Sequence, residues 1–468
     1  MKISYDEKDA EMKGMGRRDA LKQLGLGSAA LLAGGSTSAS AKTKLSAFAS
    51  RKEADIVIAG GGTAGITVAA RLRRSAPNAS ITLIAPNDVH LYQSGQVYVA
   101  AGLYREFDNK RRTKELIPDN VTWLHDKVMR FSPEENTVYT EKNGKIPYDY
   151  LVVALGCEYD YGWVEGVSVS DIGKKGIASV YLNDVDEGLA SGATISRMWL
   201  RAVRRHAQRS EQKVLFADPK GPVKGEGASL DMLFLANDML KGNGRHKKGE
   251  DLRSKVSLTL SKAGEHLFPS PEIERAVKRE LALAKNVTVS YGEELAYIDK
   301  ERKVAVYNTS DGQRIERAYD FLHITPEVKP PEVLGSSGLA VENGPYEGWL
   351  EVDEKTLRNP RYPNVFGLGD IVGLPSGKSG GAVREQAIVL QDNIAAVLED
   401  KKLPMEYNGY SVHPIRTRYG RVILAEYTPH GPEPTFPLDP AKPRWLWWEM
   451  DLHLMRTAYF GLMMRGML

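Results

Sequence analysis

The stretch ADIVIAGGGTAGITVAARLRR, residues 54–74, decides the fold class. Residues 56–58 form a short apolar run that is typical of a strand buried in a parallel sheet. Glycine-rich residues 60–65 follow at once, and residues 66–72 then place apolar side chains at helical spacing. The pattern predicts a strand, a tight turn and a helix, which is the first unit of an α/β protein with Rossmann-like dinucleotide-binding domains.

Three glycines in this turn have a chemical interpretation. Gly60 suits the tight turn, Gly62 lets the backbone approach a pyrophosphate, and Gly65 permits close packing of the helix on the strand. The alternative is a purely structural glycine-rich turn. An acidic residue is expected directly after the second strand to bind the ribose, but the chain reads APND at residues 85–88. The ribose contact therefore stays open, with Asn87 and Asp88 as candidates.

The composition excludes several classes of protein. With 468 residues, 42% of them hydrophobic and 26% charged, the chain matches ordinary globular domains rather than a disordered or collagen-like protein. No apolar run reaches the roughly 18 residues needed to cross a bilayer as a helix. The net charge of +3, without a long basic block, argues against a nucleic-acid partner.

The single cysteine, Cys157, limits the available chemistry. One thiol cannot form an internal disulfide, a CxxC redox pair or a cysteine-based zinc site. We therefore expect no metal site, and chemistry that comes from a cofactor or from other side chains.

Residues 1–41 predict a targeting segment. Arg17 and Arg18 precede a short apolar stretch at residues 24–35, and Ala-Ser-Ala follows at residues 39–41. This arrangement is typical of twin-arginine export, with an amphipathic N-terminal helix and a chance arginine pair as the alternative. We therefore expect a folded protein on the periplasmic side of the inner membrane.

Two later segments predict further strands of the same domain. Residues 149–156 and 364–369 are short apolar runs that each end in glycine, and Asp370 follows the second, before a helix expected at residues 376–387. The Asp370 carboxylate could hydrogen-bond a ribityl hydroxyl of a flavin, or it could be a helix N-cap.

Taken in order, these segments resemble the sulfide:quinone oxidoreductase family of flavoproteins, most closely its mitochondrial branch. The resemblance runs from residue 53 to about residue 468. The matching stretches are GGGTAGIT (60–67), HLYQ (90–93), IPYDYLVVALG (146–156), FLHITPEVKPPEVL (321–334), GWLEVDEKTLRNPRYPNVFGLGD (348–370) and RVILAEY (421–427).

The resemblance implies a pyridine nucleotide-disulfide oxidoreductase-like fold that holds FAD and delivers electrons to a membrane quinone. By position, it implies contacts from Gly60, Gly62 and Gly65 to the FAD pyrophosphate, from the Val128 backbone to the adenine, and from Gly369 and Asp370 to the ribityl and pyrophosphate region. Lys378 would lie near the flavin ring, where a cation stabilises the anionic reduced form. The alternative for Lys378 is a solvated surface lysine.

The cysteines with which the family oxidises sulfide are missing. Gly225 and Ile371 stand at their two positions, and His413 occupies a third position that is often cysteine. Cys157 is interpreted as a small buried hydrophobe, with a flavin adduct or a persulfide as the alternative. Glu226 is a candidate general base, against the more ordinary reading of a solvated loop carboxylate.

Five segments are expected along the chain. They are a signal peptide (1–41), the first part of the FAD domain (53–158), a second Rossmann-like domain (159–320), the second part of the FAD domain (321–400), and a C-terminal hairpin with amphipathic helices (401–468). The loop at residues 217–222 of the second domain carries two prolines where pyrophosphate-binding amides are needed, so we expect no use of NAD(P)H.

The C-terminal residues 444–468 are amphipathic. At helical spacing, Trp445, Trp448, Met455 and Tyr459 share one face, while charged side chains line the other. The segment is too polar to span a bilayer but fits a helix in the membrane interface, as the resemblance also implies. The alternative is a helix packed on the protein's own core or on a second copy.

These observations predict a membrane-associated FAD oxidoreductase that passes electrons from sulfide, or another small reduced sulfur compound, to a quinone without the cysteine relay. One alternative keeps the flavin but changes the donor, or uses a periplasmic cytochrome as acceptor. Another is a non-catalytic, flavin-binding membrane scaffold. The sequence leaves open whether FAD is covalently bound and whether the protein is a homo-oligomer.

Overall fold

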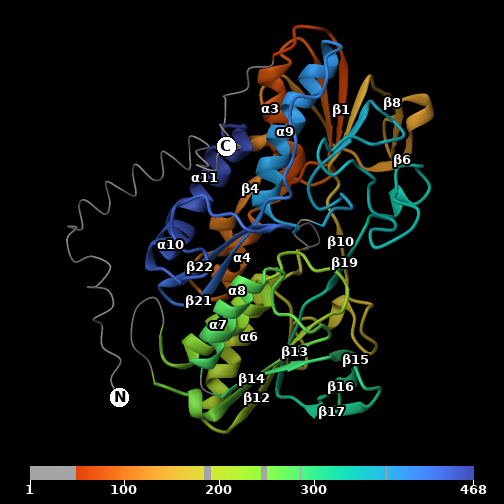
Figure 1. The fold of residues 1–468 in the computed structure, drawn as a ribbon. Coiled ribbons are helices and arrows are strands. Elements are labelled where there is room, and N and C mark those ends of the chain that lie inside the picture. The colour runs from red at the N-terminus through yellow and green to blue at the C-terminus, as the bar shows by residue number, and fades with distance from the viewer. Residues whose placement is uncertain (1–48, 184–190, 244–249, 285, 376) are drawn as a thin grey trace, which may run out of the picture.

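Two parallel sheets, each covered by helices, form the body of the protein (Figure 1). The computed structural model describes residues 49–183, 191–243, 250–284, 286–375 and 377–468. The predicted signal peptide, residues 1–41, lies outside the described residues. The two Rossmann-like cores confirm the predicted fold class.

The first sheet is built around the segment that opens the domain. All its neighbouring strands are parallel, in the order β20 (Val365–Gly367), β9 (Tyr150–Val153), β1 (Asp55–Ala59), β2 (Ser80–Ile84) and β5 (Val121–Leu124). Helices α3 (Thr63–Ser75) and α9 (Gly380–Leu398) pack against each other beside it. Because β1, β9 and β20 are adjacent and parallel, the loops after them meet at one edge of the sheet.

The second sheet has the same parallel arrangement. Its order is β11 (Ile177–Ala178), β18 (Phe321–Ile324), β12 (Gln212–Asp218), β13 (Val256–Lys262) and β14 (Val287–Tyr291), with helices α6 (Gly192–Ala207), α7 (Ala228–Leu240) and α8 (Pro271–Ala282). Strand β18 thus lies in this sheet, just beyond the boundary expected at residue 320. The antiparallel strands β10 (Glu158–Asp160) and β19 (Glu327–Lys329) connect the two halves (Figure 1).

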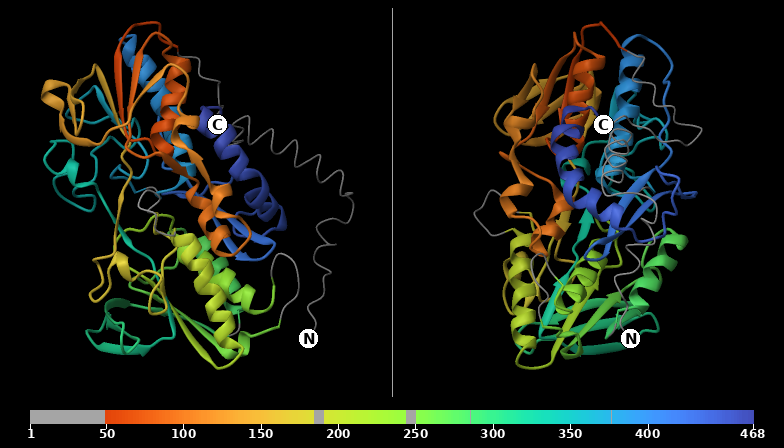
Figure 2. Two further views of the ribbon diagram at one scale, coloured as in Figure 1. Left: turned by 180° about the vertical axis from the view of Figure 1, so that it is seen from behind. Right: turned by 90° about the vertical axis from the view of Figure 1, so that its left-hand side faces the viewer.

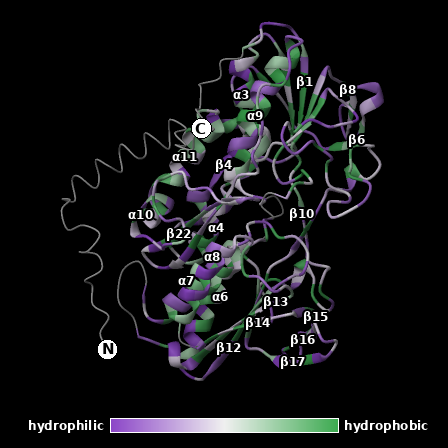
Figure 3. Ribbon diagram, viewed as in Figure 1, coloured by the Kyte–Doolittle hydropathy of each residue, from purple (hydrophilic) through white to green (hydrophobic). Residues whose placement is uncertain are grey.

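Smaller antiparallel elements surround the two sheets. They are β6 (Val128–Ser132) with β7 (Thr137–Thr140) and β8 (Gly144–Pro147), β15 (Glu293–Asp299) with β16 (Val304–Thr309) and β17 (Arg314–Ala318), and β3 (Val89–Leu91) with β4 (Lys110–Arg112). Two short helices, α4 (Gln96–Ala100) and α5 (Thr113–Leu116), follow β3 and β4 respectively. Hydrophobic residues are concentrated in the central strands, and hydrophilic ones on the outer faces of the helices (Figure 3).

The C-terminal segment runs along one side of the half that contains the first sheet (Figure 2). It contains the hairpin β21 (Ser411–Arg418) and β22 (Arg421–Thr428), the short β23 (Gly431–Pro432), α10 (Trp445–Glu449), the π-helical η7 (Met450–Met455) and α11 (Arg456–Gly461). The π-helical turn interrupts the regular helix that was expected. Trp447 and Phe460, which lie outside the predicted apolar face, are also buried. Among the described residues, no helix combines the length and apolarity that crossing a membrane requires.

Candidate functional site

The turn between β1 and α3 has the geometry of a pyrophosphate-binding loop. Gly60 adopts φ +114°, and a Cβ on Gly65 would overlap the carbonyl oxygen of Gly60. A Cβ on Gly62, in contrast, would meet no atom of the described chain within 4 Å. Gly62 caps α3 without a side-chain hydrogen bond, and no acidic residue lies in the first helical turn. The helix therefore presents open amides to open space, which fits the diphosphate of a dinucleotide.

Gly369 and Asp370 lie directly beside this turn. Gly369 adopts φ +82°, and a Cβ there would lie 2.8 Å from the Cβ of Ala64 in α3. Its amide donates a hydrogen bond of 2.8 Å to the side chain of Gln386 in α9. The expected helix after Asp370 begins at Gly380, where the Ser379 hydroxyl accepts from the Ala382 amide at 3.1 Å. Ser379 is therefore the N-cap of α9, and Asp370 is not the N-cap of this helix.

A buried ion pair joins Asp370 to the second half of the protein. The Lys224 ammonium lies 2.7 Å from an Asp370 carboxylate oxygen. Burial alone would raise the pKa of Asp370, but the charges of Lys224 and Lys378 hold it below its usual value. Burial likewise opposes the charge of Lys224, yet Asp370 raises the pKa of that lysine. Both groups are therefore ionised at neutral pH.

Lys378 lies beside this ion pair, and the three residues Lys224, Asp370 and Lys378 form one cluster of charges. Its ammonium donates to the backbone carbonyl of Asp370 at 2.6 Å and lies 3.6 Å from the centre of the Trp349 ring. Burial lowers its pKa. Lys378 is therefore not a solvated surface lysine, and its charge is available to a group bound beside Asp370.

Cys157, directly before β10, lies beside the same group of charged residues. Its sulfur lies 3.9 Å from an Asp370 carboxylate oxygen. Burial, together with the charge of Asp370, raises the pKa of the thiol to about 12. The thiol is thus protonated and weakly nucleophilic, although it is near the predicted cofactor.

Glu226 and Val128 take other positions. Burial raises the pKa of Glu226, and its Oε2 has no hydrogen-bond partner among the described residues. Its other oxygen, like the Tyr427 hydroxyl, would lie 2.6 Å from a Cβ on Gly377. One oxygen of the half-buried Glu226 side chain is therefore shielded from solvent, but Glu226 is not among the residues that line the cavity of about 260 Å³ beside Asp370. Val128 begins β6, in a separate three-stranded sheet, and it is not among the residues that line the cavity beside Asp370.

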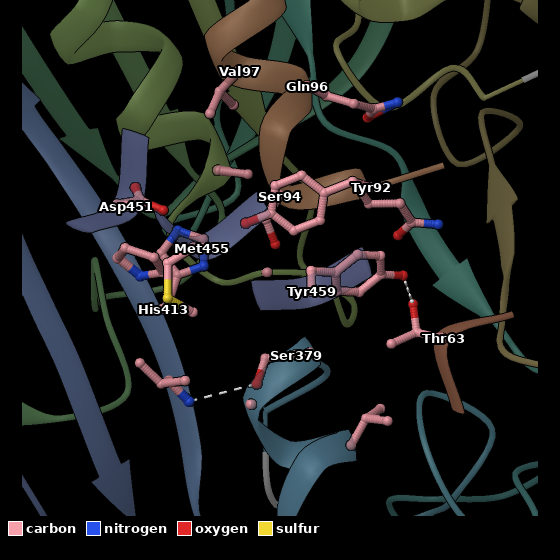
Figure 4. A pocket seen from close by; sticks show the side chains of 18 of the residues that line it. Thr63, Tyr92, Ser94, Gln96, Val97, Ser379, His413, Asp451, Met455 and Tyr459 are labelled. Carbon is pink, nitrogen blue, oxygen red and sulfur yellow. Dashed lines mark hydrogen bonds between the residues drawn. The ribbon is translucent and has the colours of Figure 1, made fainter. Parts of the chain in front are cut away.

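A cavity of about 260 Å³ extends from this cluster to the C-terminal segment. Its polar end is lined by Lys224, Asp370 and Lys378, and its other end by apolar side chains of the C-terminal segment, among them Met455. Figure 4 looks into the cavity past Ser379, His413 and Tyr459. One continuous space thus connects the dinucleotide turn with the segment expected at the membrane.

Two sets of side chains around the cavity were not predicted. The Tyr459 hydroxyl bonds Thr63 of α3 at 2.7 Å and the ring nitrogen of buried His90 at 2.6 Å, and so ties the C-terminal segment to the dinucleotide turn. A second set joins Asp231, Arg416 and Asp451 in buried ion pairs. The charged residues were visible in the sequence, but only the fold brings such distant positions together.

Comparisons with known proteins agree with this architecture. The family model described as pyridine nucleotide-disulphide oxidoreductase matches residues 54–190. The mitochondrial sulfide:quinone oxidoreductase of Mus musculus is 31% identical over 416 residues, which are 88% of this chain and 86% of that protein. The mitochondrial sulfide:quinone oxidoreductase of Dictyostelium discoideum is 32% identical over 414 residues, again 88% and 86%.

The fold agrees as well. The X-ray structure of the sulfide:quinone oxidoreductase from Aquifex aeolicus matches with a TM-score of 0.67 at 23% identity, over 87% of this chain and 89% of that chain. The sequence identity to the mitochondrial proteins extends over almost the whole length on both sides. The chain is an oxidoreductase that belongs to the sulfide:quinone oxidoreductase family.

Proposed function

We propose that the protein is an FAD-dependent oxidoreductase that passes electrons from sulfide, or another small reduced sulfur compound, to a membrane quinone without a cysteine relay. When bound, FAD supplies the two-electron redox chemistry that the side chains lack. The names of the relatives supply the classes of donor and acceptor, and the site explains how this chain would use them.

The residues of the site fit FAD. The open space in front of Gly62 and the free amides of α3 would hold the pyrophosphate. Gly369 and Asp370 would contact the ribityl and pyrophosphate region, and Lys378 would neutralise negative charge on the ring. The contact of Val128 with the adenine remains part of this proposal.

The donor would meet the cofactor directly. The sequence holds one cysteine, so no intramolecular disulfide can store an electron pair. Gly225 lines the cavity, and Ile371 is completely buried, at the two positions where the resemblance places the redox thiols. Cys157 stays protonated at neutral pH because its pKa is raised to about 12.

The cavity is the observation that carries the proposal. It joins the cation-rich cluster around Asp370 to the apolar C-terminal segment without interruption. With the cofactor at the polar end, a quinone needs an apolar approach to it, and the end of the cavity lined by the C-terminal segment offers one. We further propose that the protein is exported by the twin-arginine route. We also propose that its C-terminal segment, in which Leu454 and Met467 are exposed, lies in the membrane interface, so that the apolar end of the cavity is at the periplasmic face of the inner membrane.

The test is an anaerobic visible spectrum of the purified protein, titrated with sulfide and then with a soluble short-chain quinone. We expect sulfide to bleach the flavin band and quinone to restore it, in the C157A variant as well as in the wild type. Failure of sulfide to bleach the band would remove sulfide as donor. Failure of quinone, together with reoxidation by a co-purified cytochrome, would replace the acceptor, and a colourless protein that takes up no FAD would overturn the proposal entirely.

A further inference from the structure

We propose that the electron donor binds as a sulfur anion beside the Lys224–Asp370 ion pair, where the Tyr159 hydroxyl donates a hydrogen bond to it. The inference deepens the proposed function and rests on it, because it assumes a sulfur donor that enters the cavity. Gly225 and Ile371, where the resemblance places the two redox thiols, directly follow Lys224 and Asp370. The ion pair, at 2.7 Å, therefore joins the residues next to the two positions that lack a thiol.

The donor must be held there by noncovalent contacts. Cys157 is the one cysteine of the sequence, and its thiol is protonated at neutral pH because burial raises its pKa to about 12. No thiolate of the chain is therefore available to hold a sulfur atom covalently. Gly225 lines the cavity without a side chain. Binding of a small anion then depends on positive charge and on a hydrogen-bond donor whose proton is not already shared.

Tyr159 lies next to the loop that carries Gly225. In β10, Tyr159 pairs with Val328 of β19, and the Val328 amide donates a hydrogen bond of 2.9 Å to the carbonyl oxygen of Pro222. Pro222 precedes Lys224 and Gly225 in the same loop. Tyr159, Lys224 and Gly225 all line the cavity. The phenol and the ammonium therefore face one space from two segments that are bonded to each other through β19.

A chain of side-chain hydrogen bonds sets the direction of the Tyr159 hydroxyl. The Gln96 amide donates to the side-chain oxygen of Asn183, and the Asn183 amide in turn donates to the Tyr159 oxygen at 3.3 Å. Because the hydroxyl accepts from Asn183, its own proton points away from that amide, and no acceptor for it lies among the described residues. The ring packs edge-to-face on Tyr181, with 5.8 Å between the centroids. Tyr159 thus holds an unused O–H donor in a fixed position.

The charges at this end of the cavity favour an anion. Lys224 and Lys378 carry two positive charges against the one negative charge of Asp370, so the cluster is positive overall. Burial raises the pKa of Tyr159 to about 12, so the phenol stays a neutral donor at neutral pH. A hydrogen bond to an anion is stronger than one to a neutral molecule. The site therefore selects hydrosulfide, or the thiolate of a small organic thiol, over neutral sulfur compounds.

The first test measures the binding of an anion that is not oxidised. Thiocyanate, a small sulfur-containing anion, is titrated into the oxidised holoprotein and followed by the visible difference spectrum of the flavin. We expect Y159F to weaken thiocyanate binding about tenfold, because the ring stays and the hydrogen bond to the anion is lost. The matched control is Y161F, which should keep the wild-type affinity. Tyr161 donates to the Ser179 hydroxyl at 3.0 Å and is not among the residues that line the cavity.

The second test follows anaerobic flavin reduction in stopped flow, with sulfide in one arm and mercaptoethanol in the other. In either arm two donor sulfurs join in a disulfide bond, and the electron pair passes to the cofactor. Y159F should raise the half-saturating donor concentration about tenfold and keep the limiting rate near that of the wild type, because Tyr159 binds the donor and transfers no electron. The arm that shows this separation identifies the anion as hydrosulfide or as an organic thiolate.

FAD content and the melting temperature of each variant control for folding. Equal thiocyanate affinity in Y159F and the wild type, or a wild type that binds no thiocyanate, would overturn the role of Tyr159. Equal losses in Y159F and Y161F would show a structural effect and overturn it as well. If thiocyanate binding weakens in Y159F alone but neither donor reduces the wild type, the anion site stands and the sulfur donor of the proposed function is wrong.

Discussion

The ammonium of Lys224 and the carboxylate of Asp370 lie 2.7 Å apart, and this pair links the two halves of the protein at the cavity. Lys224 precedes α7 in the half that contains the second sheet, and Asp370 follows β20 of the first sheet. The side chains are 23% and 10% exposed, so both charges depend on each other for compensation. The pair therefore fixes the loop that carries Gly225 against the dinucleotide turn.

Replacement of Lys224 by methionine should destabilise the protein. Loss of Lys224 removes the direct ion-pair partner of Asp370 and leaves only the more distant charge of Lys378 to offset the carboxylate, at a cost of about 3 kcal/mol in the free energy of unfolding. The double variant K224M/D370N should recover a large part of this loss, because neither charge then remains. Urea unfolding of the holoprotein measures both. The matched control is K220M in the same loop, since Lys220 is exposed. Equal stability of K220M and K224M would contradict a coupled pair.

Two glycines of the same turn should respond differently to alanine. G65A should destabilise the protein by about 3 kcal/mol even without cofactor, because the new Cβ overlaps the carbonyl oxygen of Gly60. G62A has free space around its Cβ within the chain, so the cofactor-free protein should keep its melting temperature. The methyl group would stand where the pyrophosphate is expected, and FAD binding should weaken by about tenfold. Unchanged FAD affinity in G62A, measured by fluorescence titration, would place the pyrophosphate elsewhere.

The charge on Lys378 should set the redox potential of the flavin. Its ammonium is held beside Asp370, and K378M removes a cation that favours the anionic reduced form. We expect the two-electron midpoint potential to fall by about 30 mV, which corresponds to about 1.4 kcal/mol. K378R, which keeps the charge, is the control and should stay closer to the wild type. Spectroelectrochemical titration measures the potential. Equal values in K378M and the wild type would show that the Lys378 charge does not act on the flavin ring.

Much of the fold follows from local sequence pattern. The apolar run at residues 56–58, followed at once by glycines, predicts a buried strand, and Gly60 and Gly65 each have a steric reason to lack a side chain. These patterns involve residues close together in the sequence, so they predict the strand and the turn without knowledge of the structure. The start of α9 was less readable, because glycines and serines at residues 376–381 fit a loop and a helix start equally well.

The contacts across the cavity were not readable in this way. Lys224 and Asp370 are 146 positions apart, from 224 to 370, and no local pattern links them. The C-terminal amphipathic pattern assumed a regular helix, whereas residues Met450–Met455 form the π-helical η7. Asp451 within it is buried and pairs with Arg416, 35 positions earlier in the chain, and this pairing is known only from the fold.

Cys157 should be unreactive towards alkylation near neutral pH. Its pKa is raised to about 12, against a usual value of 9.0, so at pH 8 its thiolate fraction is on the order of 10³ times smaller than that of an ordinary thiol. We expect iodoacetamide to label the native protein slowly at pH 8 and the urea-unfolded protein rapidly, as read by mass spectrometry. C157A should reduce and reoxidise like the wild type. Rapid labelling of the native protein with loss of flavin reduction would give this thiol a chemical role.

His90 should make the attachment of the C-terminal segment sensitive to acid. Burial lowers the pKa of His90 from 6.5 to about 4, so between these values the unfolded chain binds a proton that the native protein does not. The stabilising contribution is complete above pH 6.5, and at most about 3 kcal/mol is lost as the pH falls to about 4. H90N, which does not titrate, should show a shallower loss of stability over this range. Part of the slope should remain, because buried His323 also has a pKa of about 4.

The measurement is urea unfolding at a series of pH values between 4 and 7, followed by tryptophan fluorescence. Trp447 and Trp448 are buried in the C-terminal segment, so its release contributes to the signal. The matched control is H125N, because nearly half of the His125 side chain, 47%, is already exposed to water. H125N should keep the wild-type profile. If H90N and the wild type lost stability in parallel as the pH falls, the neutral imidazole bonded to Tyr459 would not be what holds this segment against the dinucleotide turn.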